Sequence, residues 1–163
     1  VMNPTGEMIS EDDQRWLIEV TKAAGVNIVS DEVYLDAAKG TEFYRPMYKI
    51  ANNSISINSL TKTYGLGPIR FGWMIGDPDL ILNAKKAFQN MQGLASAPTV
   101  SIAKSVFPRL DEALEGIWQA REHNLPKLVK GLQSHGIQWT PPPFGIYGAF
   151  PTRLFSPTCS ARA

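Results

Sequence analysis

The sequence predicts an α/β fold, with a mostly parallel sheet covered by helices on both faces, because short β-branched runs alternate with segments of helical period. The predicted strands are short and apolar, and they comprise residues 26–30, 54–58 and 71–75. Amphipathic segments flank these strands, the first from Ser10 to Ala24 and the second from Asp77 to Met91. Ligands of such folds bind at the carboxyl ends of the strands. We therefore expect the functional residues to follow the predicted strands.

The predicted helix ends carry residues that satisfy free backbone groups. Ser10 precedes three acidic residues, so its hydroxyl can cap a helix whose first turn holds carboxylates. Gly25 follows the last apolar position of this helix, where a left-handed C-terminal cap is expected. Asp77 and Pro78 form a second helix start, because proline is favoured at the first helical position.

The sequence from Thr99 to His135 again has a helical pattern, but it contains two prolines. A proline lacks the backbone N–H, so Pro108 must break this pattern and Pro126 must kink or restart it. We expect a short helix followed by a longer, bent one. Residues 137–150 predict an extended stretch that leads out of the domain, with a hinge to a second domain.

Composition excludes several classes of protein. The chain has 163 residues, the size of one ordinary domain, and its 44% hydrophobic and 19% charged residues are typical of globular proteins. A net charge of +1 provides no field that attracts nucleic acid or an anionic membrane. Small molecules are therefore the expected partners.

Cysteine, histidine and the first residues bear on metal binding and location. Cys159 is the only cysteine, so neither an internal disulfide nor a CxxC metal site is possible. His123 and His135 lack acidic or cysteine neighbours at metal-ligand spacing.

No run approaches the roughly 20 apolar residues of a membrane span and no signal segment opens the sequence, so we expect a cytoplasmic protein. Because Val1 precedes Met2, we also expect the chain to be cut from a longer one.

Polar side chains follow the first two predicted strands and precede the third. Asp31 and Tyr34 come after the first strand, Lys62 comes after the second, and Arg70 lies directly ahead of the third. A turn over residues 3–6 precedes the first helix. Each feature has an ordinary explanation when taken alone, such as a solvated lysine, a capping carboxylate, a core tyrosine or a surface ion pair. Their order and spacing carry the functional inference.

This ordered set of motifs resembles that of the fold type I pyridoxal-phosphate enzymes, above all the class I/II aminotransferases. In that family an Asn-Pro-Thr-Gly turn, an Asp-x-x-Tyr at a strand end, a Ser-x-Ser/Thr-Lys and an arginine eight residues later occur in this order. The matching residues here are Asn3 to Gly6, Asp31 with Tyr34, Ser59 to Lys62, and Arg70. The resemblance extends from Asn3 to about Phe150. It implies the fold type I large domain, a three-layer sandwich of which this chain holds only the central part.

The resemblance assigns the reactive groups of the cofactor to particular residues. It implies that Lys62 holds pyridoxal 5'-phosphate as a Schiff base, since a lysine amine that has lost its proton condenses with the aldehyde. It places Asp31 beside the pyridine nitrogen, where a carboxylate favours the protonated ring that acts as an electron sink. Asn3 and Tyr34 match the positions that donate hydrogen bonds to the ring hydroxyl oxygen.

The phosphate of the cofactor requires hydroxyl donors and the planar fork of a guanidinium. Ser59, Thr61 and Arg70 match the phosphate-binding positions of the family. With Lys62 as the catalytic residue and no metal ligands, the predicted cofactor-binding set is Asn3, Asp31, Tyr34, Ser59, Thr61, Lys62 and Arg70.

The resemblance also implies an activity and a domain organisation. Members of this family transfer an amino group between an amino acid and a 2-oxo acid, and the full-length enzyme is expected to be a homodimer. Residues 1–140 are then part of the cofactor-binding large domain, and residues 141–163 are the start of the small domain or an aberrant tail. The family's glycine-containing phosphate turn and its substrate-carboxylate arginine have no match in this sequence. We therefore expect an incomplete fragment that is not a competent aminotransferase by itself.

Two other functions remain open at this point. A pyridoxal-phosphate lyase or decarboxylase has the same fold, because the cofactor contacts do not determine which substrate bond breaks. A non-catalytic remnant that binds a partner would retain the same motifs. A dinucleotide-binding loop is rejected, because Gly65-Leu66-Gly67 lacks the third glycine and precedes a strand instead of a helix.

Overall fold

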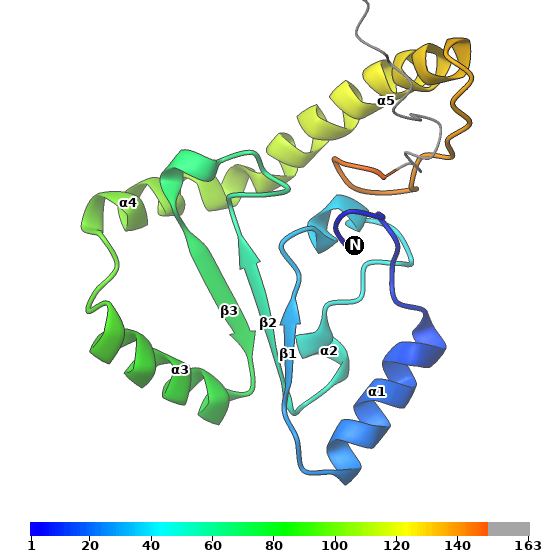
Figure 1. Cartoon of the computed structure of the whole chain (residues 1–163). Helices are drawn as coiled ribbons and strands as arrows, with labels where there is room; N and C mark the ends of the chain where they lie inside the picture. Colours follow the sequence, from blue (N-terminus) through cyan, green and yellow to red (C-terminus); the bar gives the residue numbers. More distant parts are fainter. Residues whose placement is uncertain (150–163) are drawn as a thin grey trace, which may run out of the picture.

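The computed structural model describes residues 1–149 and shows a small sheet with helices around it (Figure 1). Within the described residues, the α-helices are α1 (Glu11–Ala23), α2 (Met47–Ile50), α3 (Pro78–Met91), α4 (Ala97–Val106) and α5 (Leu110–Ser134). The strands are β1 (Ile28–Asp31), β2 (Ser54–Ser59) and β3 (Gly72–Gly76). Short 3-10 helices occur at η1 (Leu35–Ala38), η2 (Gly67–Ile69) and η3 (Phe107–Arg109). The predicted α/β class is confirmed.

The sheet has the order β1-β2-β3 and is mixed. β1 runs parallel to β2, with Asp31 opposite Ile57, whereas β3 runs antiparallel to β2, with Gly72 opposite Ser59. The direction of β3 follows from its connection to β2, because only a 3-10 helix lies between them and parallel neighbours require a crossover, usually an α-helix. The amino end of β3 therefore lies at the same edge of the sheet as the carboxyl ends of β1 and β2.

The caps predicted for the first helix are present. The Ser10 hydroxyl accepts a hydrogen bond from the Asp13 backbone N–H at 3.1 Å, and α1 begins at Glu11. After the last turn, Gly25 has a φ of +64°. Asp77 likewise accepts hydrogen bonds from the first turn of α3, where Pro78 is the first helical residue.

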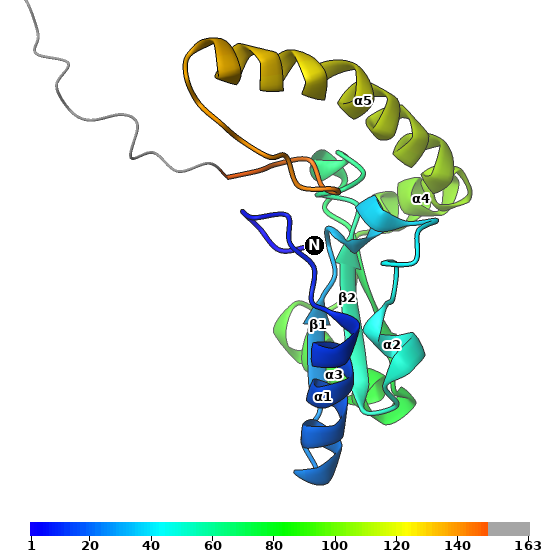
Figure 2. The same ribbon diagram turned by 90° about the vertical axis from the view of Figure 1, so that its right-hand side faces the viewer.

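The helices α1, α2 and α3 lie around the sheet. α1 lies beyond the β1 margin and α3 beyond the β3 margin (Figure 1), while α2 lies on one side of the sheet (Figure 2). Ile28 of β1 forms a small core with Met47 and Ala51, and Leu17 and Ile18 of α1 pack against it. These contacts fix α1 and α2 relative to β1.

A second core lies at the edge of the sheet where β2 ends. Leu60 and Tyr64, which follow β2, are buried together with Ala103 of α4 and Leu114 of α5. α4 and α5 cross this end of the sheet (Figure 1). The loop that carries Lys62 is therefore packed on helices that come from much later in the sequence.

Truncation of Leu60 is expected to lower the free energy of unfolding by about 2–5 kcal/mol, because this side chain is fully buried and its removal leaves a cavity. Leu94, which is 85% exposed, is a matched control, and Leu94→Ala should change the free energy of unfolding by less than about 0.5 kcal/mol. Chemical denaturation of both variants measures the difference. Equal effects would show that the second core does not support the fold.

The long C-terminal helical region confirms the predicted effect of its first proline. α4 ends at Val106, η3 contains Pro108, and α5 starts at Leu110. Pro126 lies inside α5, which curves along its length (Figure 2). The second proline is thus accommodated in a bent helix rather than at a restart.

Residues 137–149, the described part of the predicted extended stretch, contain no strand. Bends occur at residues 143–146, and the other residues of this segment have no regular secondary structure. The Arg121 guanidinium donates hydrogen bonds to the backbone oxygens of Pro142 (2.5 Å) and Gly145 (3.2 Å), so this segment is held against α5. Phe150 and the rest of the predicted small domain or tail, including Cys159, lie outside the described residues.

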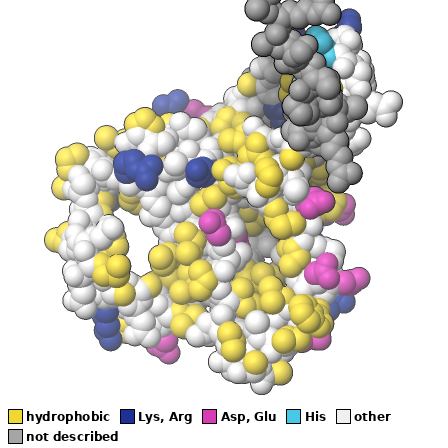
Figure 3. Space-filling model, viewed as in Figure 1, with side chains coloured by type: hydrophobic (Ala, Val, Ile, Leu, Met, Phe, Trp, Pro, Cys, Tyr) yellow, Lys and Arg dark blue, Asp and Glu magenta, His cyan; other side chains and the backbone are white. Residues whose placement is uncertain are grey.

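Large apolar side chains are exposed on several elements. Trp16 of α1, Val29 of β1 and Met91 of α3 are 63%, 65% and 82% exposed. Hydrophobic side chains gather in patches over the face seen in Figure 3. Apolar surface of this kind is typical of protein interaction sites. Within residues 1–149, no helix is both long enough and apolar enough to cross a membrane.

Candidate functional site

The carboxyl ends of β1 and β2 carry two of the predicted site residues. Asp31 is the last residue of β1, and its exposed carboxylate accepts one hydrogen bond, from the Val33 backbone N–H at 3.2 Å. Ser59 is the last residue of β2, and its hydroxyl accepts a hydrogen bond from the Thr61 backbone N–H at 3.3 Å. Because β1 and β2 are parallel neighbours, both side chains lie at the same edge of the sheet.

Asn3 and Tyr34 meet although they are 31 positions apart in the sequence. The Asn3 side-chain amide lies 3.5 Å from the Tyr34 hydroxyl. The turn that carries Asn3 is closed by a hydrogen bond from the Gly6 N–H to the Met2 oxygen at 2.7 Å. Gly6 has a φ of +75°, and a Cβ there would lie 2.2 Å from Pro142, so only glycine fits at the end of this turn.

Tyr34 also contacts Tyr147, a residue that the sequence did not single out for the site. The two rings meet edge to face, with their centroids 4.7 Å apart. Burial, together with the neighbouring Tyr34, raises the pKa of Tyr147 to about 12, so its phenol stays protonated at neutral pH. The only sequence signal for Tyr147 was its place in the Gly145-Ile146-Tyr147 run after the long helix.

Lys62 lies in a tight turn directly after β2. The Gly65 N–H donates to the Lys62 backbone oxygen at 3.0 Å, and this bond closes the turn. The side chain of Lys62 is exposed, and its amine has no hydrogen-bond or ion-pair partner among residues 1–149. Such an amine is accessible to a ligand from the solvent.

Arg70 precedes β3 and so lies at the same sheet edge. It has a φ of +53°, which makes it the single non-glycine residue with a positive φ in the described chain. Its guanidinium donates to the Gly67 oxygen at 3.5 Å and pairs with no carboxylate within residues 1–149. Left-handed backbone at a non-glycine residue stores strain and is characteristic of functional positions.

The predicted site residues form two groups in space. Asn3, Asp31 and Tyr34 line a cleft of about 520 Å³ between the first residues of the chain, α1 and the end of β1. Ser59, Thr61, Lys62 and Arg70 lie outside this cleft, along the neighbouring end of β2 and the start of β3. The topology therefore brings both groups to one edge of the sheet, and no single described pocket encloses them.

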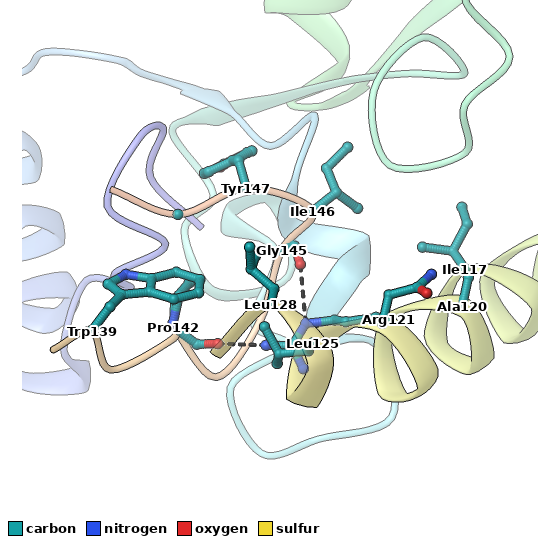
Figure 4. A pocket seen from close by; sticks show the side chains of 12 residues that line it. Ile117, Ala120, Arg121, Leu125, Leu128, Trp139, Pro142, Gly145, Ile146 and Tyr147 are labelled. Atoms are coloured by element: carbon teal, nitrogen blue, oxygen red, sulfur yellow. Dashed lines mark hydrogen bonds between the residues drawn. The ribbon is translucent and has the colours of Figure 1, made fainter. Parts of the chain in front are cut away.

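A second hollow of about 410 Å³ lies between α5 and the segment after it (Figure 4). Arg121 points into this region and donates to the Pro142 and Gly145 oxygens. Leu125, Leu128 and Trp139 make its lining mainly apolar. This hollow contains none of the predicted site residues, although Tyr147, which contacts Tyr34, lines it.

The described part of the chain holds no cluster of three or more His, Cys, Asp or Glu side chains that could bind a metal ion. His123 and His135 are both exposed. His123 contacts Lys127, and His135 contacts the Gly131 backbone oxygen.

A buried acid that the sequence did not single out is Asp36, two residues after Tyr34. It accepts hydrogen bonds from Asn58 and Tyr64. The signal that could have found it is its place in the apolar run Leu35-Asp36-Ala37-Ala38.

Comparison with known proteins identifies the family. The family model "Aminotransferase class I and II" matches residues 1–157. The chain belongs to the class I and II aminotransferase family. The resemblance predicted from the four motifs is therefore confirmed.

Two relatives from this family show how much of each chain can be aligned. It is 27% identical to an aspartate aminotransferase of Bacillus subtilis (strain 168) over 154 residues, which are 89% of this chain and 38% of the relative. It is 30% identical to an aspartate aminotransferase of Thermococcus kodakarensis over 88 residues, which are 54% of this chain and 24% of the relative. The chain thus spans well under half the length of these relatives.

Solved structures agree with this family assignment. A pyridoxal-phosphate-dependent (PLP-dependent) aminotransferase from Streptococcus suis superimposes with a TM-score of 0.72 at 26% identity, over 81% of this chain and 35% of that one. The N-succinyldiaminopimelate aminotransferase from Mycobacterium tuberculosis gives a TM-score of 0.76 at 23% identity, over 90% and 38% of the two chains. The predicted fold type, of which this chain holds only a part, is confirmed by these superpositions.

Proposed function

We propose that this chain supplies the pyridoxal-phosphate-binding residues of an enzyme that transfers an amino group between an amino acid and a 2-oxo acid. The observation that carries the proposal is the meeting of Asn3 with Tyr34 beside Asp31, at the sheet edge where Lys62 follows β2. Membership of the aminotransferase family supports it. So does the family order of all four motifs.

The side chains at this edge fit the groups of the cofactor. The Asn3 amide and the Tyr34 hydroxyl lie 3.5 Å apart, so an oxygen anion that lies beside both groups can accept a hydrogen bond from each. Asp31 accepts only one hydrogen bond from the described residues, which leaves its second oxygen for a protonated ring nitrogen. These three residues thus suit an aromatic heterocycle that bears a hydroxyl group.

The other group of residues fits the aldehyde and the phosphate. The Lys62 amine is exposed and unpaired within the described residues, so it can form a covalent bond with an aldehyde carbon. The Arg70 guanidinium pairs with no described carboxylate. Arg70 lies two residues before Gly72, which is opposite Ser59 in the sheet. A guanidinium fork and nearby hydroxyl donors are the groups that bind a phosphate.

Each residue then has one task. Pyridoxal phosphate, when bound, supplies an electron sink conjugated to the α-carbon of the substrate. Asp31 keeps the ring nitrogen protonated, and Asn3 and Tyr34 orient the ring through its hydroxyl oxygen. Lys62 would hold the aldehyde group of the cofactor, and its amine would move a proton at the substrate α-carbon.

The test of this function uses the protein produced from its complete gene and supplied with pyridoxal phosphate. We expect nitrogen-15 from at least one member of a panel of amino acids to appear in glutamate when 2-oxoglutarate is the acceptor. Mass spectrometry of the products measures the transfer. If the cofactor binds but no amino acid in the panel donates its nitrogen to 2-oxoglutarate or to pyruvate, the transfer function is refuted.

A second candidate is another reaction that uses the same cofactor. The PLP-dependent cyclase OrfR superimposes on this chain with a TM-score of 0.75 at 27% identity, over 88% of this chain and 38% of that one. The same fold therefore carries chemistry other than transamination. Release of ammonia or carbon dioxide without a labelled amino acid product would identify a lyase or a decarboxylase.

We also propose the domain organisation and surroundings that the family implies. Residues 1–140 are part of the large domain and residues 141–163 are the start of the small domain or an aberrant tail, of which 150–163 lie outside the described residues. The exposed apolar surface of α3 and β1 supports contacts with further elements or with a second subunit of a homodimer. A sequence with a single cysteine is compatible with a reducing, cytoplasmic location.

A further inference from the structure

A buried carboxylate lies behind the edge of the sheet that carries the candidate site. Asp36, in η1, is only 5% exposed. One of its oxygens, Oδ2, accepts hydrogen bonds from the Asn58 amide at 2.7 Å and from the Tyr64 hydroxyl at 2.7 Å. Asn58 lies near the end of β2, and Tyr64 lies two residues after Lys62. Asp36 therefore joins both sides of the turn that carries Lys62.

A second hydrogen bond fastens the same turn to the same segment. The Thr63 hydroxyl, on a residue that is 1% exposed, donates to the Val33 backbone oxygen at 2.8 Å. The two residues directly after the exposed Lys62 are thus both buried, and both are bonded to the segment that follows Asp31. Two side-chain hydrogen bonds therefore hold the Lys62 turn against the segment after β1, in addition to the packing of Leu60 and Tyr64 in the second core.

The burial of Asp36 makes its hydrogen bonds necessary. A buried carboxylate must be hydrogen-bonded, because its removal from water is costly unless its lone pairs find donors. The 2.7 Å distances to Asn58 and Tyr64 show that Asp36 has these donors. Burial and the bond to Asp36 raise the pKa of Tyr64, so its phenol remains a donor at neutral pH.

We propose that Asp36 is a positioning residue that fixes the Lys62 turn against the carboxyl end of β1. The Lys62 amine then keeps its position relative to Asp31 and Tyr34. The need for this fixed position rests on the proposed function, in which these residues bind one cofactor. The fastening of the turn is independent of that function. None of the four family motifs includes Asp36.

Glu32 provides a matched control within the same segment. It is 8% exposed, and its Oε1 accepts hydrogen bonds from the Met47 backbone N–H at 2.7 Å and the Ser56 hydroxyl at 2.8 Å. These partners lie in α2 and in the middle of β2. Loss of Glu32 therefore removes a comparable buried carboxylate without removing a bond to the Lys62 turn.

The first experiment compares Asp36→Ala with Glu32→Ala in the full chain without cofactor, by hydrogen exchange resolved to peptides. Asp36→Ala is expected to speed exchange in residues 59–66 about tenfold more than in residues 47–56, which is the order of effect of one lost hydrogen bond. Glu32→Ala should show the reverse preference. Unchanged exchange in residues 59–66, or an equal increase in both peptides, overturns the proposal.

Tyr64→Phe decides the matter if Asp36→Ala does not fold. It removes only the hydroxyl that donates to Asp36, and it keeps the ring that belongs to the second core. Faster exchange confined to residues 59–66 supports the proposal, and no change there overturns it. Asp36→Asn, which keeps an oxygen acceptor for both donors, should restore most of the protection that Asp36→Ala loses.

A second measurement links the fastening to the cofactor. Peptide mapping after borohydride reduction gives the pyridoxal phosphate concentration at which half of Lys62 is labelled. Asp36→Ala should raise this concentration about tenfold and Glu32→Ala less than about twofold. Absence of any label on Lys62 in the unmodified chain would refute the proposed function, whereas exchange in residues 59–66 would still decide the role of Asp36.

Discussion

Lys62→Ala is expected to abolish the covalent attachment of pyridoxal phosphate to the protein. The amine of Lys62 is exposed and free of partners among residues 1–149, and it follows the strand that lies beside Asp31. An aldehyde condenses with an uncharged lysine amine, and alanine provides no nucleophile in its place. Borohydride reduction, proteolysis and mass spectrometry should therefore find the pyridoxyl group on the Lys62 peptide of the unmodified protein and on no peptide of the variant.

Two controls make this result specific. Lys104→Ala removes another exposed lysine, on α4, and should leave labelling of the Lys62 peptide unchanged. Lys62→Arg keeps the positive charge but cannot form the bond, so it should behave like Lys62→Ala. Label on Lys49 or Lys104 in the unmodified protein, with none on Lys62, would overturn the assignment.

The element types and most of the boundaries could be predicted from the sequence, because local interactions set them. The Ser10 cap acts within one helical turn, and Asp77 with Pro78 fixes the start of α3 in the same way. The shared edge of the motifs could also be predicted, since residues that follow parallel strands meet at the carboxyl end of the sheet. The exact assignment of cofactor groups to Asn3, Asp31 and Lys62 stays a prediction.

Other features could not be predicted, because they depend on contacts between distant parts of the chain. The burial of Leu60 and Tyr64, on either side of Lys62, depends on how this segment packs on α4 and α5. The return of residues 137–149 toward the site depends on Arg121, whose partners lie 21 and 24 positions away. An aspartate in an apolar run indicates only a buried acid, and the partners of Asp36 become known only from the fold.

The substitution Asp31→Asn is expected to lower the turnover of the proposed reaction by about 10²–10³-fold while the protein still folds and binds its cofactor. Asparagine has the same shape and keeps an oxygen that can accept the Val33 N–H, the single hydrogen bond that Asp31 receives within the described chain. It lacks the negative charge that favours a protonated ring nitrogen, and the loss of one fixed electrostatic partner of a reacting group costs this order of rate. The exposed position of Asp31 makes a large loss of stability unexpected.

Three measurements on one preparation separate the electronic role of Asp31 from a structural one. The thermal midpoint of Asp31→Asn should lie close to that of the unmodified protein, because exposed substitutions change stability by about 0.5 kcal/mol or less. Pyridoxyl label should still reach the Lys62 peptide after borohydride reduction. Transfer of labelled nitrogen should fall, whereas Asp79→Asn, which neutralises another exposed carboxylate in the first turn of α3, should leave it unchanged. Wild-type transfer by Asp31→Asn with the cofactor bound would mean that Asp31 does not act on the ring nitrogen, and that the charge beside the cofactor comes from another residue.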